Sequence, residues 1–205
     1  MSKGEETRER IVAQAASIFN RKGYAGTALS DLMDATGLEK GGIYRHFTSK
    51  QELAGEAFDY AWKVAMEMRF ADTEQIPNAV DRLKQLILNF RDRRSGLVPG
   101  GCPLLNTAVD ADDSNPQLRT KARHALSSLL DRLESIVDEG KQRGEICRDI
   151  DARKLVVLTL STLEGALMLN RLQKSSEPLD IACAHLVEHL ETVVRAKKKP
   201  KSTPR

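Results

Sequence analysis

Cysteines and aromatic residues are scarce in this chain, and each absence narrows the range of possible functions. Only 3 of the 205 residues are cysteine, and 4% are aromatic. The cysteines lie far apart with no C-x-x-C pair, so we expect no disulfide framework. No apolar run approaches the length of a membrane span, and residues 1–26 lack the apolar core of a signal peptide. The sequence therefore predicts a cytoplasmic protein with no membrane partner.

Charged residues are abundant, at 30% of the chain, and they are unevenly distributed. Residues 1–50 hold eight Lys or Arg and six Asp or Glu, while residues 195–205 hold six basic residues and no acidic one. Because the whole chain carries a net charge of only +3, the stretch between these two is acidic. This asymmetry fits a basic head that touches a polyanion. The basic tail, residues 197–205, is expected to be disordered because it cannot bury a core.

Apolar residues recur at helical spacing along nearly the whole chain. The pattern predicts nine helices and no strand, so the protein is expected to be all-α. Proline is expected to open four of the helices. The expected helices are residues 5–22, two short helices within 27–47, 50–71, one from Pro77 to Ser95-Gly96, one from Pro103, 116–140, 152–174 and one from Pro178.

Residues 27–50 read as two short helices separated by a glycine turn. Leu29 and Leu32 share a face of the first helix, and Ile43 and Phe47, four positions apart, share a face of the second. Gly37 follows the first helix, where a residue that tolerates positive φ is needed. The spacing predicts a helix-turn-helix.

The outward face of the second helix combines glycine with arginine. If Ile43 faces the core, Gly41, Gly42 and Arg45 point away from it. Each glycine costs about 1 kcal/mol in a helix relative to alanine, so stability alone would not select it. A glycine allows close approach to a groove floor, where Arg45 can bind guanine O6 and N7. The alternative is a small three-helix bundle with a solvated Arg45, and spacing alone leaves it open.

A further helix is expected to begin at Lys50, just after this stretch. Ser49 and Glu52 form an S-x-x-E capping box, which leaves free N–H groups at the positive end of the helix dipole. Lys50 adds a positive charge at that end. We therefore expect Lys50 to anchor a phosphate.

The stretch resembles the N-terminal domain of the TetR family of bacterial transcriptional regulators. The matching positions are Thr27, Ala35, Gly37, Gly41, Tyr44, His46, Phe47 and Lys50. The resemblance implies base contacts from Lys40 to Arg45, including Gly41 and Gly42, and phosphate contacts from Thr27, Tyr44, His46 and Lys50. The sequence departs from the family pattern at Gly42, where a Ser or Thr hydroxyl is frequent, and at Met33, where a small residue is usual.

The last two helices are strongly apolar, and the first of them contains a patch of small residues at Gly165 and Ala166. Two such helices fit a dimer formed through a four-helix bundle, and an internal helix hairpin is the alternative. The family resemblance favours the dimer. A two-fold dimer is expected to bind a near-palindromic operator with half-sites about 34–36 Å apart.

Catalytic and cofactor motifs do not stand out, so we expect neither an enzyme nor a cofactor. His185, Glu188 and His189 match H-x-x-E-H, but no third zinc ligand is identifiable. Cys102 precedes Pro103 near an expected helix N-terminus, which makes it a candidate for a redox-sensitive thiol. Six residues are expected to line an effector cavity between body helices. They are Trp62, Met66, Phe90, Leu105, Asn106 and Thr159.

These patterns predict an N-terminal three-helix DNA-binding domain, residues 1–48, followed by a helical effector-binding and dimerisation domain, residues 49–196. The expected function is that of a homodimeric, sequence-specific regulator, a repressor that a small molecule releases from double-stranded operator DNA. One alternative is a DNA-binding regulator without a small-molecule ligand. Another is a thiol-based sensor that acts through Cys102.

Overall fold

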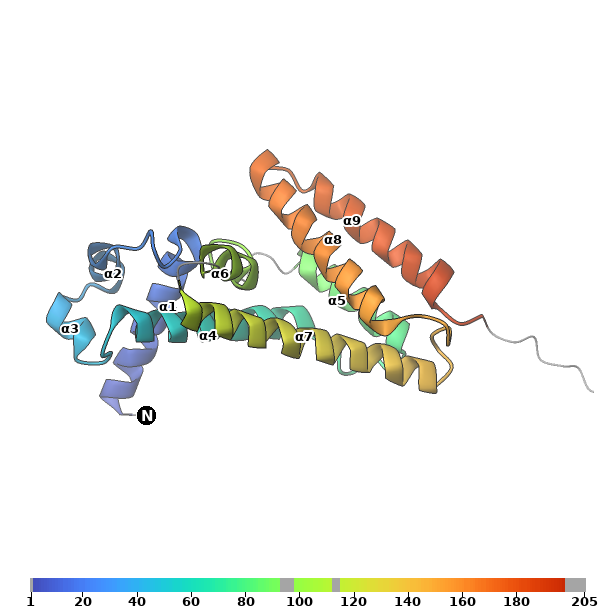
Figure 1. Ribbon diagram of the computed structural model, residues 1–205, viewed down its shortest axis with the longest axis horizontal. Helices are drawn as coiled ribbons and strands as arrows, with labels where there is room; N and C mark the ends of the chain where they lie inside the picture. Colours follow the sequence, from blue (N-terminus) through green and yellow to red (C-terminus); the bar gives the residue numbers. More distant parts are fainter. Residues whose placement is uncertain (1, 93–97, 112–114, 198–205) are drawn as a thin grey trace, which may run out of the picture. The chain divides into compact units, whose positions relative to one another are not determined.

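The computed structural model of the protein describes residues 2–92, 98–111 and 115–197 (Figure 1). Within these ranges the chain forms α-helices and no strand, as the sequence predicted. The helices are α1 (Lys3–Lys22), α2 (Leu29–Thr36), α3 (Lys40–Tyr44), α4 (Lys50–Phe70), α5 (Ala79–Asp92), α6 (Pro103–Ala111), α7 (Pro116–Gln142), α8 (Ala152–Gln173) and α9 (Glu177–His189). The predicted helix stop at Ser95-Gly96 and the basic tail from residue 198 onward lie outside the described residues.

The helices divide into two compact units. The first comprises Met1–Arg69 and Arg93–Ser128, and the second comprises Phe70–Asp92 and Leu129–Arg205. α7 contributes to both units, and α4 lies in the first unit except for its last residue, Phe70. The expected division between residues 48 and 49 stays a prediction. The first unit also contains α6, which therefore lies in the same unit as the helix-turn-helix.

The predicted apolar stripes form the core of the first unit. Ile11 and Ala15 of α1, Leu32 of α2 and Ile43 of α3 are at most 1% exposed, and Phe47, just after α3, is 2% exposed. Burial of an aliphatic or aromatic side chain of this size contributes about 1.5–3 kcal/mol. This core therefore fixes the positions of α2 and α3 relative to α1.

In the second unit α8 and α9 run alongside each other as a hairpin, and α5 packs against α9 (Figure 1). The side chain of Asp151 caps α8 by accepting a hydrogen bond of 2.9 Å from the Lys154 amide. α5 begins two residues after Pro77, because the Asn78 side chain accepts hydrogen bonds from the amides of Val80 and Asp81. The expectation that Pro77 opens this helix is therefore corrected: Asn78 caps it, and α5 begins at Ala79.

Apolar side chains also cover the outer face of α8. By length and composition α8 qualifies as a candidate membrane span, and only 33% of its most apolar 18-residue segment is buried within the protein. Glu164 and Arg171 interrupt the apolar sequence of this helix, so no uninterrupted apolar run reaches the length of a membrane span. The exposed residues are Val157, Leu158, Met168, Leu169 and Leu172, between 38% and 74% exposed. A single helix of this kind is only a weak indication of a membrane span.

A cluster of charged side chains ties the C-terminal end of the second unit to α5. α9 continues into a π-helical turn, Leu190–Val194, and Arg195 follows it. The Arg195 guanidinium binds the carboxylates of Asp81 and Glu191, and Lys84 binds Glu191 as well. These contacts lower the pKa of Glu191 from 4.5 to about 2, chiefly through the hydrogen bond from Arg195 and then that from Lys84.

Acid should weaken the fold through Glu191. Because the pKa of Glu191 in the folded chain lies below its ordinary value of 4.5, its stabilising contribution is present above pH 4.5 and disappears as the pH falls towards about 2. Glu191→Gln should therefore reduce the loss of unfolding free energy over this interval. Urea denaturation at neutral pH and at about pH 3.5 measures the effect. Glu188→Gln, at an exposed position of α9, is the control, and equal pH dependence in both variants would contradict this assignment.

Candidate nucleic-acid interface

The turn between α2 and α3 is built around Gly37. This residue has φ of 65° and ψ of 20°, the left-handed conformation, and its amide donates a hydrogen bond of 2.8 Å to the Met33 carbonyl. The Thr36 hydroxyl is buried and donates to the Leu32 carbonyl at 2.7 Å. A side chain at position 37 would be strained in this conformation. The glycine therefore ends α2 as the sequence predicted.

The face of α3 that points away from the core carries the predicted glycines. A Cβ built on Gly41 meets no atom within 4 Å, and one built on Gly42 makes only ordinary contacts, the nearest at 3.4 Å from Leu38. Neither position has a φ in the range from +20° to +160°. Nothing within the described residues therefore requires glycine at position 41, although glycine weakens a helix.

Charged and polar side chains surround this glycine surface. Lys40, Tyr44 and Arg45 are exposed, and His46 is half-buried. In the described part of the chain the side chains of these four residues make no hydrogen bond or ion pair. α3 is shorter than expected, so Arg45 and His46 lie in the turn that follows it. They remain available to an external partner.

Thr27 does not lie where a phosphate contact requires it. It is only 2% exposed, and its hydroxyl donates a hydrogen bond of 2.6 Å to the Gly23 carbonyl. A buried hydroxyl whose proton is already used cannot donate to a phosphate oxygen. The structure therefore corrects the expected role of its side chain: Thr27 closes the loop between α1 and α2.

Lys50 has an internal hydrogen-bond partner, and its expected role as a phosphate anchor stays a prediction. Its ammonium group donates a hydrogen bond of 2.6 Å to the Tyr24 carbonyl and lies 4.3 Å from the centre of the Tyr24 ring. Burial lowers the pKa of Lys50, while the carboxylates of Asp110 and Asp31 oppose that shift. This side chain therefore joins the start of α4 to the loop between α1 and α2.

α4 begins at Lys50 as predicted, but only half of the expected capping box is present. The Glu52 amide donates to the Ser49 hydroxyl at 3.1 Å. The Glu52 carboxylate accepts instead from the amide and the hydroxyl of Thr48, both at 2.6 Å. The hydroxyl of Thr48, then its amide and then Arg8 lower the pKa of Glu52.

A helix-turn-helix that buries its apolar face and presents glycine, arginine and lysine on its free face defines a DNA-binding domain. Comparison with known proteins agrees. Residues 11–57 match the family model of bacterial regulatory proteins of the tetR family, and residues 79–186 match the tetracyclin repressor-like C-terminal domain.

The chain belongs to the TetR family, and it is a DNA-binding transcriptional regulator rather than an enzyme. An uncharacterised HTH-type transcriptional regulator of Mycobacterium tuberculosis is 31% identical over 85% of this chain and 89% of its own length. A solved structure of a TetR regulator from Chloroflexus aurantiacus has a TM-score of 0.91 and 46% identity, covering 96% of this chain and all of that one. Another, from Cytophaga hutchinsonii, has a TM-score of 0.89 and 34% identity, covering 97% and 99%.

The six residues expected to line an effector cavity are divided between the two units. Trp62, Met66, Leu105 and Asn106 belong to the first unit, and Phe90 and Thr159 belong to the second. A cavity of about 30 Å³ in the first unit is lined by residues of α1, α4 and α6. Of the six, only Asn106 lines it. This volume suits a water molecule and is far below that of a pocket for a small ligand.

Asn106 has a structural role that the sequence did not reveal. Its amide nitrogen lies 2.9 Å from the Asn20 carbonyl oxygen, 3.0 Å from the Asn20 side-chain oxygen and 2.9 Å from the Gly100 carbonyl oxygen. This amide therefore joins α6 to the end of α1. Nothing local in the sequence signals the contact, because Asn20 and Asn106 are 86 positions apart.

Cys102 is buried, at 2% exposed, and lies just before α6. A guanidinium nitrogen of Arg69 is 3.3 Å from its sulfur, and Arg69 is itself only 7% exposed. A neighbouring cation favours thiolate chemistry, whereas burial restricts access of an oxidant. A redox role for Cys102 stays a prediction. In the described ranges no group of three or more His, Cys, Asp or Glu residues is placed to hold a metal ion.

Proposed function

We propose that this TetR-family regulator is a cytoplasmic homodimer that represses transcription from a near-palindromic operator and leaves it when a small molecule binds. The observation that carries the DNA-binding part of the proposal is the free face of α3. Nothing in the described residues requires glycine at position 41, and the side chains of Lys40 and Arg45 make no hydrogen bond or ion pair with the described residues.

We propose the following contacts with DNA, and the position of each residue on that face supports them. Lys40, Gly41, Gly42 and Arg45 meet the base edges in the major groove, and Arg45 provides the bidentate contact with guanine. Tyr44 and His46 contact the phosphates on either side. Lys50 contributes chiefly by holding the preceding loop in place, because its ammonium group is already bonded to Tyr24.

Gly41→Ala is expected to change stability and DNA binding in opposite directions. The free protein should gain up to about 1 kcal/mol, because alanine favours a helix and the added methyl meets no atom within 4 Å. Operator binding should weaken about tenfold, because overpacking a fitted contact costs about 1–3 kcal/mol. Thermal unfolding and fluorescence anisotropy measure the two effects. Gly4→Ala, in α1, is the matched control, and unchanged operator affinity would remove Gly41 from the proposed interface.

The dimer is assigned to α8 and α9. On α8 the exposed residues Leu158, Met168, Leu169 and Leu172 surround Gly165, and on α9 Ile181 is 63% exposed. A Cβ built on Gly165 meets no atom within 4 Å, so there is room there for close approach of another helix. Exposed apolar faces of this kind mark interaction sites. Pairing of two copies would bury them and form a four-helix bundle.

Release by an effector requires only that the small molecule bind more tightly to the conformation with low DNA affinity. The repressor role is supported by a relative that is 24% identical over 84% of this chain, the HTH-type transcriptional repressor DhaR of a Mycobacterium species. Which of the six predicted residues contact the effector stays a prediction.

Selection of bound fragments from genomic DNA tests the proposed function. We expect recovery of one near-palindromic sequence upstream of a small number of genes, and reduced transcription from it when the protein is added. A thermal-shift screen with compounds related to the products of those genes then tests for an effector. Fragments without a shared sequence would contradict the proposal, and activation on addition of the protein would contradict the repressor role.

A further inference from the structure

We propose that Asp110, on α6, is a positioning residue for the DNA-binding surface, although it lies outside the helix-turn-helix. This inference rests on the proposed function, and it adds that the contacts between α6 and the loop from Gly23 to Thr27 set the DNA affinity.

The loop approaches α6 so closely that only glycine fits at its start. Gly23 ends α1 with φ of 72°, and a Cβ built on it would lie 2.3 Å from a carboxylate oxygen of Asp110. The other carboxylate oxygen accepts a hydrogen bond of 2.6 Å from the Tyr24 amide. The conformation and the absence of a side chain at Gly23 thus both serve this contact. Hydrogen bonds to a charged group are about twice as strong as neutral ones.

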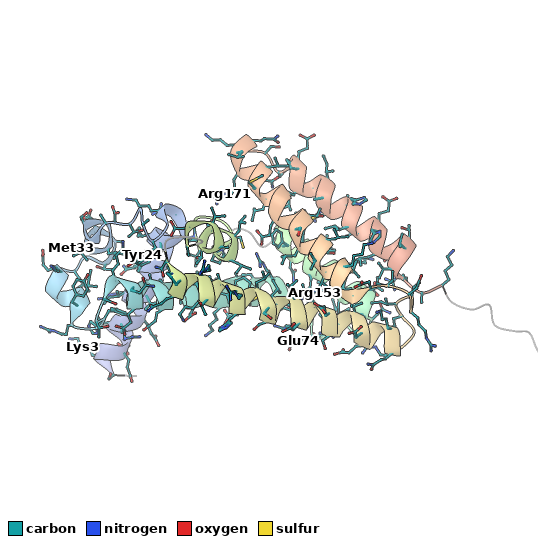
Figure 2. The ribbon with its side chains drawn as sticks, in the orientation of Figure 1. Lys3, Tyr24, Met33, Glu74, Arg153 and Arg171 are labelled. Atoms are coloured by element: carbon teal, nitrogen blue, oxygen red, sulfur yellow. The ribbon has the colours of Figure 1, made fainter. Side chains whose placement is uncertain are left out.

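The same residue of the loop is held from its other side by α4. The Tyr24 carbonyl accepts the hydrogen bond of 2.6 Å from Lys50, so α6 binds the N–H group of Tyr24 and α4 binds its C=O group. Figure 2 labels Tyr24 at this position between α1 and α2. The charges agree with this arrangement, because Asp110 and Asp31 both favour the ammonium form of the half-buried Lys50.

The loop in turn fixes the start of α2. The Thr27 hydroxyl bonds to the Gly23 carbonyl, and the Asp31 carboxylate accepts from the Ala28 amide at 2.9 Å and from Lys22 at 2.6 Å. α2 then leads through the Gly37 turn to α3. A displaced Tyr24 would therefore move the start of α2, and with it the face that carries Arg45.

α6 itself is fastened to α1, so it provides a fixed support. Asn106 binds the carbonyl and side-chain oxygens of Asn20. Asn20 is 8% exposed, and its amide nitrogen lies 3.1–3.2 Å from three carbonyl oxygens of the segment that precedes α6, those of Val98, Pro99 and Gly101. Asp110 lies one helical turn after Asn106 on the same helix. Two successive turns of α6 therefore contact the C-terminal end of α1 and the loop that follows it.

The first measurement uses the full-length free protein and needs no DNA. Asp110→Ala should increase amide hydrogen exchange in residues 23–28, because the Tyr24 amide loses its acceptor. Asp110→Asn keeps an acceptor oxygen and should restore much of the protection. Val109→Ala, at a neighbouring position that is 74% exposed, is the control and should leave exchange unchanged. Equal exchange in Asp110→Ala and the unsubstituted protein would overturn the inference.

The second measurement uses the fragment that the unsubstituted protein selects from genomic DNA. Asp110→Ala should bind it about tenfold more weakly, within the range of ordinary coupling between sites, and Asp110→Asn should recover part of the loss. DNA should also protect residues 103–111 from exchange in the unsubstituted protein, because coupling is reciprocal, and this protection should be absent in Asp110→Ala. If Asp110→Ala unfolds at the assay temperature, Asp110→Asn decides. The inference would be overturned if Asp110→Asn and a fully folded Asp110→Ala both showed the same operator affinity and the same DNA-induced protection as the unsubstituted protein.

Failure of the proposed function gives a different result. If the unsubstituted protein selects no DNA sequence, the proposed function is contradicted, while the exchange experiment on the free protein still decides whether Asp110 holds the loop.

Discussion

Arg45→Ala is expected to lower the affinity for the selected operator about 5- to 150-fold, because a bidentate contact with guanine is worth about 1–3 kcal/mol. Binding to unrelated DNA should fall much less, since it depends on the total positive charge rather than on one base contact. The expected result is thus a loss of discrimination between sequences. Titration of the selected fragment and of a scrambled fragment at the same salt concentration measures it.

Arg123→Ala is the matched control for this substitution. Arg123 is an exposed arginine of α7, and its replacement removes the same charge outside α3. It should leave the preference for the selected fragment unchanged. If Arg45→Ala instead weakens binding to both fragments equally, Arg45 contacts phosphate and the base reading belongs to Lys40 or to the helix backbone at Gly41 and Gly42.

Gly165→Arg is expected to convert the dimer into a monomer that remains folded. The free chain has room for the new side chain, because a Cβ at position 165 meets no atom within 4 Å, and arginine favours a helix more than glycine does. In the proposed dimer, however, the side chain would place a charge where two apolar α8 helices meet. Loss of the second half-site contact should then weaken operator binding about 100-fold or more. Sedimentation velocity and operator titration measure the two effects.

Two control variants test whether the position and the charge of the new arginine are both needed to break the dimer. Gly165→Ala adds only a methyl group and should remain dimeric, and Ser127→Arg adds the same charge at an exposed position of α7. Neither should change the oligomeric state. A dimeric Gly165→Arg protein with normal operator affinity would show that this face of α8 is not the interface.

Gly41 and Gly165 share one property that the sequence predicted only in part. A Cβ at Gly41 and one at Gly165 both meet open space, whereas a Cβ at Gly23 would collide with Asp110. The sequence suggested that Gly41 and Gly165 permit close approach of another surface, but it does not distinguish such glycines from those that the fold itself needs. The distinction depends on which atoms surround each position, and those atoms come from distant parts of the chain.

Local rules succeeded where the interactions are local. The helix starts at Lys50, Pro103 and Pro116, and the turn at Gly37, depend on residues within a few positions of one another. The apolar stripes of α1 to α4 were also predictable, because each helix must bury one face. The cap at Asn78 was not predictable in the same way, because Pro77 next to it is the stronger local signal for a helix start.

Local rules failed where side chains are used by distant partners. Thr27 and Lys50 were expected to bind phosphate, yet the Gly23 carbonyl accepts the hydroxyl proton of Thr27, and the Tyr24 carbonyl accepts one of the three N–H groups of Lys50. Asn106 was expected to line an effector cavity; it lines only a cavity of about 30 Å³, and its amide donates to Asn20, 86 positions away. No pattern within a single helix can reveal such partners, since they are brought together only when the helices pack.

By itself, the sequence determined that the protein is all-α and where most helices begin and end, because these depend on short-range spacing. Spacing in residues 27–50 predicted a helix-turn-helix, and the resemblance of that stretch to the TetR family identified it as DNA-binding. Only the tertiary structure decided which polar groups of that region are free and which are already bonded. It left Lys40, Tyr44, Arg45 and His46 available, and it committed Thr27 and Lys50 to the loop that α6 supports, because hydrogen-bond partners far apart in sequence meet only in the folded chain.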